Sequence, residues 1–448
     1  MATADYARLA DGIATDIAEG RLKPGDRLPP QRQFAYERGI AVSTASRIYA
    51  ELLRRGLVVG EVGRGTFVAG ETRQTAAAAT REPGDAAIDL EFNFAILPEQ
   101  SALMAKSMAA LNAPDALQAA LRPVTSAGTA AARRSFAGLL GRGGWAPAPE
   151  TLLFTGGGRQ SIAAAMAALV PTGGRCGVEA ITYPLVKGIA ARLGITLVPL
   201  AVDAEGLRPD AVEKTHREAR LSALYLQPML HNPLGMSMSP ARRQDIARLA
   251  GTLDLMMIED AIYGFLAEEP PLAALAPEHC ILVDSLSKRL APGLTLGFAC
   301  APARYRERLM AAIRSGGWMA QAYLAAAGER MAADGTIADV MRRKQADAAE
   351  RQRIAAECLA GLAVQADPRA YHLWLTLPDH WRSQTFVAAA ARRGITLTPS
   401  SAFAVSPGHA PNAVRLALAA PPIEPLRMAL QTLARMLAAR EEDYDFSE

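Results

Sequence analysis

Residues 71–88, a segment that includes ETRQTAAAATREPGDAA, hold almost no large apolar side chain. A stretch of this composition cannot bury enough apolar surface to fold, so we expect it to be a linker. The 448 residues are also too many for one core. The sequence therefore predicts a small N-terminal module, residues 1–70, and a large module, residues 89–448.

The first 70 residues have the pattern of three helices and a hairpin. Leu9, Ile13 and Ile17 are spaced four apart on a helix expected to end near Gly20, and a second helix is expected over residues 31–38. A third helix follows Gly39 and ends at Gly56. The run LVVGEVGRGTFVAG then predicts two short strands around a glycine turn. This order is typical of a winged helix.

In a helix-turn-helix, the second helix enters the major groove of DNA, and its N-terminal side chains meet the base edges. The stretch from GRLKPGDRLPPQRQFA to GRGTFV resembles the GntR-type winged helix along its whole length. The resemblance implies contacts to operator DNA from Arg32, Ser43, Thr44, Arg47, Arg64, Gly65 and Thr66.

Two features of this module are expected to limit its contacts with DNA. Many relatives carry a polar or basic residue where this chain has Val42, so we expect fewer direct contacts to bases. Residues 1–70 hold ten Lys and Arg against eight Asp and Glu, a net charge of only +2. Affinity is therefore expected to depend on where the charges lie and on dimerisation.

The large module alternates apolar runs with helical stretches. The runs are TLLFTG, RCGVE, TLVPLAV, ALYLQP, LMMIED, CILVDS and LGFACAP. This alternation predicts a mostly parallel sheet covered by helices. A long charged helix and two shorter strand-like pieces follow, which predict a smaller α+β lobe over about residues 335–448. The fold class is thus multidomain, a winged helix-turn-helix joined to an α/β domain.

The run VDSLSKRLAPGLTLGF carries the strongest chemical signal in the chain. Lys288 stands just after an apolar strand, and a lysine in a partly dry site can lose its proton and form an imine with an aldehyde cofactor. Asp260 ends the strand-like run LMMIED, where an acid can face a pyridine nitrogen. These two residues predict a pyridoxal phosphate site.

From about Asp89 to the C-terminus the chain resembles fold-type I aminotransferases, and its fusion with a winged helix resembles MocR-type regulators. The resemblance implies that Lys288 carries pyridoxal phosphate and that Asp260 pairs with the ring nitrogen. It further implies that Asn232, in HNPLG, and Tyr263, in EDAIYGF, bind the ring hydroxyl oxygen, and that Tyr183 stacks on the ring.

The same resemblance assigns the phosphate and a carboxylate. Gly157, Gly158 and Arg159, in FTGGGRQS, would bind the phosphate at the start of a helix, together with Ser285. Arg415, in AVRLALA, would clamp the carboxylate of a substrate or effector.

Two positions depart from the aminotransferase pattern. Relatives usually carry an arginine for the phosphate where this chain has Thr295, and often a tyrosine where it has Pro123. Loss of one charge-assisted hydrogen bond of about 1.5 to 3 kcal/mol corresponds to about tenfold to a hundredfold weaker binding. Arg159 and Arg289 are the two cations expected to compensate.

The net charge, the cysteines and the length of the apolar runs exclude several classes of protein. The net charge of +3 is mild, and the four cysteines are widely spread, which argues against disulfides and a metal site. The sequence has no run of about 18 apolar residues, the length expected of a membrane-spanning helix. We therefore expect a cytoplasmic protein.

The combination predicts a regulator that binds double-stranded operator DNA as a homodimer and responds to a small amine, an amino acid or pyridoxal phosphate itself. Two alternatives stay open. One is an aminotransferase with an accessory DNA-binding module, since Asp260, Lys288 and Arg415 keep half-transamination possible. The other is a regulator whose aminotransferase fold no longer binds the cofactor. Enzymatic turnover is the less expected role because the phosphate arginine is missing.

Overall fold

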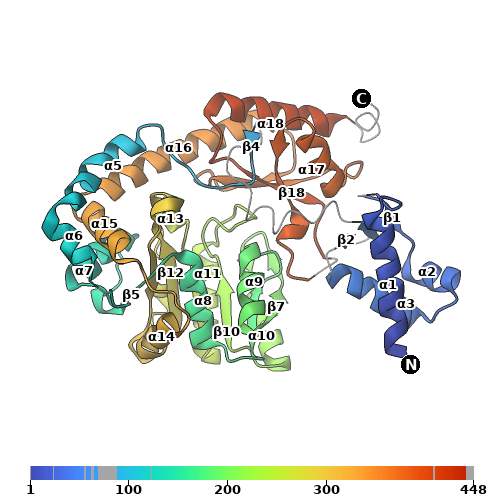
Figure 1. Cartoon of the computed structure of the whole chain (residues 1–448), viewed down its shortest axis with the longest axis horizontal. Helices are drawn as coiled ribbons and strands as arrows, with labels where there is room; N and C mark the ends of the chain where they lie inside the picture. The colour runs from blue at the N-terminus through green and yellow to red at the C-terminus, as the bar shows by residue number, and fades with distance from the viewer. Residues whose placement is uncertain are drawn as a thin grey trace.

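A computed structural model describes residues 2–23, 25–54, 57–61, 65–68, 88–122, 124–406 and 409–439. Figure 1 shows a small N-terminal module beside a large module of two lobes. The predicted linker, apart from Ile88, lies outside the described residues, as do Arg64 and Pro123.

The N-terminal module is a helical core closed by a small antiparallel sheet in the order β1-β3-β2. Ile13, Phe34, Ile48 and Leu52 are buried at its centre, so the predicted stripe on the first helix does face the core. The short strand β1 was not predicted, because a run of two residues shows no alternation. The elements are α1 (Ala2–Ala18), β1 (Arg27–Leu28), α2 (Gln31–Arg38), α3 (Val42–Arg54), β2 (Val58–Glu61) and β3 (Gly65–Val68).

The large lobe is built on a seven-stranded sheet in the order β5-β13-β12-β11-β10-β6-β7. Every neighbouring pair is parallel except the two that involve β13. Each of the seven predicted runs forms one strand of this sheet. The strands are β5 (Leu152–Thr155), β6 (Arg175–Glu179), β7 (Thr196–Leu200), β10 (Ala223–Leu226), β11 (Met256–Asp260), β12 (Cys280–Ser285) and β13 (Gly297–Cys300).

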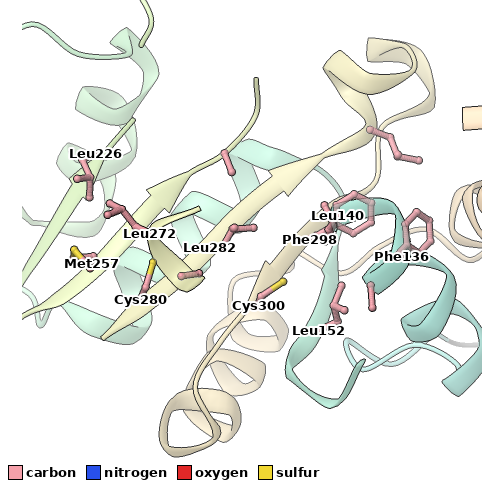
Figure 2. Packing of buried hydrophobic residues seen from close by; sticks show 14 of the residues in the cluster. Phe136, Leu140, Leu152, Leu226, Met257, Leu272, Cys280, Leu282, Phe298 and Cys300 are labelled. Carbon is pink, nitrogen blue, oxygen red and sulfur yellow. The ribbon is translucent and has the colours of Figure 1, made fainter. Parts of the chain in front are cut away.

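Helices cover the large sheet and bury its apolar side chains. Phe136, Phe154 and Phe298 form an aromatic cluster at one edge, with ring centroids 4.7 to 5.9 Å apart, and Figure 2 shows Phe136 and Phe298 within this core. The helices of this lobe are α5 (Gln100–Ala109), α6 (Pro114–Ala120), α7 (Ala130–Leu140), α8 (Gly158–Leu169), α9 (Pro184–Leu193), α10 (Pro209–Glu218), α11 (Pro240–Leu253), α12 (Leu272–Leu275), α13 (Leu286–Arg289), α14 (Ala303–Ser315) and α15 (Ala322–Ala333).

Short elements join these helices and strands. They are β8 (Val202–Asp203), β9 (Gly206–Leu207) and the 3-10 turns η1 (Ala110–Asn112), η2 (Pro149–Thr151), η3 (Gly264–Leu266) and η4 (Pro292–Leu294).

The small lobe packs helices on a four-stranded sheet in the order β14-β15-β18-β17. The long helix α16 (Thr336–Cys358) connects the lobes, because Ile337 lies in the large core and Ile354 in the small one. The remaining elements are β14 (Val364–Gln365), β15 (His372–Thr376), α17 (Ser383–Ala391), β16 (Ile395–Thr396), β17 (Thr398–Pro399), η5 (Ser400–Ala402), β18 (Ala413–Ala417) and α18 (Ile423–Ala438).

The large module begins in the small lobe, at Ile88. Strand β4 (Ile88–Asp89) pairs in parallel with β16, and Leu90 is fully buried in the small-lobe core. The sequence did not predict this pairing, because its partner strand lies about 300 residues away. The chain then reaches the large lobe, where Asn93 and Phe94 contact the predicted lysine.

One arginine of the small lobe touches the N-terminal module. Arg382, which precedes α17, donates to the carbonyl of Gly25 at 2.9 Å, and its guanidinium lies 4.2 Å from the ring centroid of Phe67. The contact places α17 against the sheet of the winged helix (Figure 1). Over the residues described, no helix combines the length and apolarity needed to cross a bilayer.

Candidate functional site

Lys288 lies on the single turn α13, directly after β12, as the sequence predicted. Its Nζ donates to the carbonyl of Asn93 and lies 3.3 Å from the ring centroid of Phe94. Burial lowers the pKa of Lys288 well below its ordinary value, and the positive charges of Arg415 and Arg159 lower it further. A lysine amine with a lowered pKa is available as a nucleophile near neutral pH.

A second lysine holds the turn that carries Lys288. The Nζ of Lys344, on α16, donates to the carbonyls of Lys288 at 3.0 Å and Leu290 at 2.6 Å. These carbonyls end the turn α13 and have no helical partner of their own. Burial lowers the pKa of Lys344 to about 7.

Asp260 is buried at the end of β11, the strand next to β12. Its Oδ2 accepts hydrogen bonds from the Tyr225 hydroxyl at 2.6 Å and from Gln227 Nε2 at 2.8 Å. Burial nevertheless raises the pKa of this carboxyl above its usual value. A buried carboxylate at this place can accept the proton of a pyridinium nitrogen.

Asn232, Tyr263 and Arg415 lie close together on the small-lobe side of Lys288. Arg415 Nη1 lies 3.4 Å from Asn232 Oδ1, and Arg415 Nη2 donates to Thr398 Oγ1 at 3.0 Å and to the carbonyl of Glu91. The Tyr263 ring centroid lies 5.6 Å from Lys288 Nζ. We call Lys288, Asp260, Asn232, Tyr263, Arg415 and Asn93 the lysine site.

The glycine turn before α8 lies against the segment of Lys288. A Cβ added to Gly158 would lie 3.2 Å from Ser285 Oγ, and one added to Gly157 would lie 3.1 Å from Thr295 Oγ1. The backbone here approaches two hydroxyl side chains closely, so a larger residue would have to displace them. The first N–H groups of α8 have no acceptor inside the helix, so this corner offers backbone and hydroxyl donors to an anion.

The two cations expected to replace the missing arginine differ in burial and in their partners. Arg289 is 1% exposed and its Nη2 lies 2.6 Å from Asp284 Oδ2, so its charge is already paired in the core. Arg159 has an exposed side chain whose Nε lies 3.3 Å from the Tyr183 hydroxyl. Of the two, Arg159 is therefore the one placed beside the glycine turn and the tyrosine expected to stack on the ring.

The residues expected to contact DNA lie on α2, α3 and β3. Arg32, Ser43 and Arg47 are exposed and Thr44 is half-buried. Gly65 has a φ of +123°, which favours glycine, and starts the wing strand that carries Thr66. Val42 is exposed at the start of α3, which leaves an apolar side chain on the face that would enter the groove.

Sequence reasoning missed several residues of these sites. Arg27 lies against the wing, since a Cβ on Gly65 would be 2.9 Å from its Nε. Tyr225, Gln227, Lys344 and Asn93 act on the lysine site through contacts with residues distant in the sequence. Only Tyr225 and Gln227, in ALYLQP, carried a signal, because they stand at the carboxyl end of a strand beside β11. Over the described residues, no three His, Cys, Asp or Glu side chains lie close enough together to hold a metal.

Comparison with known proteins covers both modules. The family model of aminotransferase class I and II matches residues 87–433, and that of the gntR family of bacterial regulatory proteins matches residues 5–68. These matches confirm the fold class predicted from the sequence.

Two bacterial transcription regulators match most of the chain. An uncharacterized HTH-type transcriptional regulator of Bacillus subtilis, YdeF, is 30% identical over 96% of this chain and 94% of its own. The vitamin B6 salvage pathway transcriptional repressor PtsJ of Salmonella typhimurium is 25% identical over 89% of this chain and 91% of its own. Among solved structures, an archaeal alanine:glyoxylate aminotransferase aligns with a TM-score of 0.73 and 20% identity over 82% of this chain and 94% of its own.

Lys344 gives the protein a pH-dependent stability. Between its folded pKa of about 7 and its unfolded value of 10.5, the unfolded chain binds a proton that the folded chain has released. The free energy of unfolding attributable to Lys344 therefore rises with pH across this window. In Lys344→Met this contribution is absent. The melting temperature of the parent, measured relative to that of the variant, should therefore rise from pH 7 to pH 10.

The exposed Lys106→Met serves as the control, and its melting curve should follow the parent at every pH. If the melting temperatures of the parent and Lys344→Met change in parallel with pH, the lowered pKa of Lys344 in the folded chain is contradicted.

Proposed function

The chain belongs to the aminotransferase class I and II family and, as a whole, to the MocR-type regulators of the gntR family, and we propose that it is a transcription regulator controlled by pyridoxal phosphate on Lys288. The observation that carries the proposal is the partly buried amine of Lys288, which lies in a site that also contains a buried carboxyl group, that of Asp260. We further propose the division into a DNA-binding module of residues 1–70, a linker of residues 71–88 and an effector domain of residues 89–448.

The residues present fit pyridoxal phosphate. The set contains an amine for the aldehyde, a buried acid for the ring nitrogen, and Asn232 and Tyr263 for the ring oxygen. Among the described side chains, Asn93 Oδ1 and Arg415 Nε are buried without a hydrogen-bond partner. Buried polar atoms are rarely left unpaired in a folded protein, so a bound molecule or water is expected beside them.

When bound, pyridoxal phosphate supplies an aldehyde that joins primary amines and a ring that withdraws electrons. Lys288 is prepared for this because burial and neighbouring cations lower the pKa of its amine and so disfavour the protonated form. Asp260 would hold the proton of the ring nitrogen, and Tyr225 and Gln227 fix the orientation of its carboxyl group. Tyr183, whose hydroxyl contacts Arg159, would cover one ring face.

For the phosphate we propose Gly157, Gly158, Ser285 and Arg159. The N-terminus of α8 favours an anion, and the Arg159 guanidinium adds the charge that Thr295 cannot supply. For the effector we propose a small amine or amino acid, or pyridoxal phosphate itself, with Arg415 binding a carboxylate where one is present.

We propose that the gntR-family module binds DNA through α3 and the wing. We propose that two chains form a dimer, because one small module with little net charge offers few phosphate contacts and a two-fold dimer matches a repeated operator. We place the protein in the cytoplasm, where a bacterial operator lies.

The decisive measurement is the visible spectrum of the purified protein with added pyridoxal phosphate. The parent should develop a yellow absorption band, because an imine between Lys288 and the cofactor extends the conjugation, and Lys288→Ala should lack it. Lys187→Ala is the matched control, since Lys187 is also a lysine whose pKa burial lowers, to about 8, but it donates to the carbonyls of Ala402 and Ala404.

No band from the parent at saturating cofactor would favour the cofactor-free scaffold. Conversion of the loaded cofactor to its amine form by added amino acids, with turnover, would favour the aminotransferase.

Arg159→Ala should weaken pyridoxal phosphate binding by about tenfold to a hundredfold, as expected for one lost charge-assisted hydrogen bond. Thr295→Arg, which restores the cation usual in relatives, should recover affinity in the Arg159→Ala background. The measurement is the dissociation constant from titration of the absorption band. Arg175→Ala, an arginine that donates to Ala219 away from the site, is the control. Equal affinities of the parent and Arg159→Ala would remove Arg159 from the phosphate site.

Arg47→Ala should weaken binding to a duplex selected by the parent from random sequence, by about tenfold to a hundredfold if Arg47 contacts a base. If Arg47 contacts a phosphate instead, the plot of log affinity against log salt should lose about one unit of slope on every sequence. Both are read from fluorescence anisotropy at several salt concentrations. Arg308→Ala, an exposed arginine on α14, is the control, and unchanged affinity and slope in Arg47→Ala would contradict the predicted interface.

A further inference from the structure

Asn93 connects the lysine site to a buried histidine. Asn93 Nδ2 lies 2.8 Å from the Tyr263 hydroxyl and 3.3 Å from His372 Nδ1. His372, on β15, is fully buried, and its ring centroid lies 5.2 Å from that of Tyr263. The three side chains come from the segment after the linker, the large lobe and the small lobe, so they meet only in the folded chain.

The hydrogen-bond directions in this cluster follow from one carbonyl. His372 Nε2 lies 2.9 Å from the carbonyl oxygen of His231, which can only accept, so Nε2 carries the proton. Burial lowers the pKa of His372 to about 3, and the nearby Arg415, His231 and Lys288 also disfavour its charged form. The ring is therefore neutral near pH 7, and its Nδ1 is an acceptor.

Because Nδ1 accepts, the group of Asn93 that faces it must be the amide nitrogen. A flipped amide would place Oδ1 against Nδ1, two acceptors without a proton between them. The two protons of Nδ2 are thus donated to His372 and to the Tyr263 oxygen. Since Tyr263 accepts from Asn93, its own hydroxyl proton is free to be donated elsewhere.

The backbone of the same residue binds the reactive lysine. Lys288 Nζ donates to the Asn93 carbonyl, and the next residue, Phe94, lies over the amine. Asn93 is 5% exposed, and glycine or alanine at this position would remove the amide that orders Tyr263. Asn93 therefore contacts two groups that an aldehyde cofactor would use. These are the Tyr263 hydroxyl, which can donate a hydrogen bond, and the Lys288 amine, which can form an imine.

We propose that Asn93 is a positioning residue of the lysine site, which together with His372 holds the Tyr263 hydroxyl as a donor toward the ring oxygen of the cofactor. This inference rests on the proposed function. A hydrogen bond from Tyr263 stabilises negative charge on that oxygen and so lowers the proton affinity of the adjacent imine nitrogen. Removing the Asn93 amide frees the hydroxyl to rotate, and the proton affinity rises.

The test is a spectrophotometric pH titration of the cofactor-loaded protein, which reports the pKa of the imine and not activity. Asn93→Leu, similar in size but apolar, should raise the midpoint by about one pH unit, a tenfold change in proton affinity. Asn93→Asp should raise it further, because the Tyr263 hydroxyl would then donate to the carboxylate. Asn412→Leu is the matched control, since Asn412 donates to the carbonyl of Trp381 in the small lobe.

A second measurement separates positioning from a general structural role. In a Tyr263→Phe background, the added Asn93→Leu should leave the midpoint unchanged, because Asn93 acts through the missing hydroxyl. A midpoint for folded Asn93→Leu equal to that of the parent, or equal shifts with and without the Tyr263 hydroxyl, would overturn the proposal. Asn93→Asp covers the case in which Asn93→Leu does not fold. Absence of any band in the parent would instead refute the proposed function.

Discussion

The buried ion pair between Arg289 and Asp284 is the constraint on which the position of Lys288 depends. Asp284 is the penultimate residue of β12 and Arg289 follows Lys288, so the pair closes the chain around the reactive turn. Breaking a buried pair by removing one partner costs about 3 to 5 kcal/mol, because it leaves a charge without compensation. Ser285 at the start of the turn and Lys344 at its end complete the support.

The lysine site is assembled from both lobes, and the segment after the linker lies between them. Asp260, Tyr263 and Lys288 come from the large lobe, whereas Arg415 and His372 come from the small lobe. The carbonyls of Glu91 and Asn93 accept from Arg415 and Lys288, respectively. A ligand that binds both lobes would therefore act on this segment as well.

Much of the fold could be predicted from local pattern. The seven apolar runs became the seven strands of the large sheet because a strand buried on both faces must be continuously apolar, as in β5, β10, β11, β12 and β13, and the edge strand β7 keeps enough apolar residues to be recognised. Lys288, Asp260, Tyr263, Asn232 and Arg415 could be named because they stand next to such strands in recognisable motifs, and the structure does bring them together. Their roles toward a cofactor stay predictions.

The rest of the site could not be predicted, because it depends on distant contacts. Asn93 contacts Tyr263, which is 170 residues away in the sequence, and His372, which is 279 residues away. No motif near Asn93 in the sequence indicates either partner. Arg289 could not be distinguished from Arg159 as a phosphate cation until burial showed that only Arg159 has an exposed side chain.

Because Lys288 contacts residues 93 and 94, the proposed cofactor and the chain would compete for one nitrogen. A free amine has protons to donate to the Asn93 carbonyl, and when it is charged it is also attracted to the Phe94 ring. An amine that has joined an aldehyde has lost these protons or directs the last one to the cofactor. The residues that such an exchange would release, Asn93 and Phe94, are continuous with β4. In the proposed complex, chemistry at a single nitrogen would thus change the binding partners of the peptide that follows the N-terminal module in the sequence.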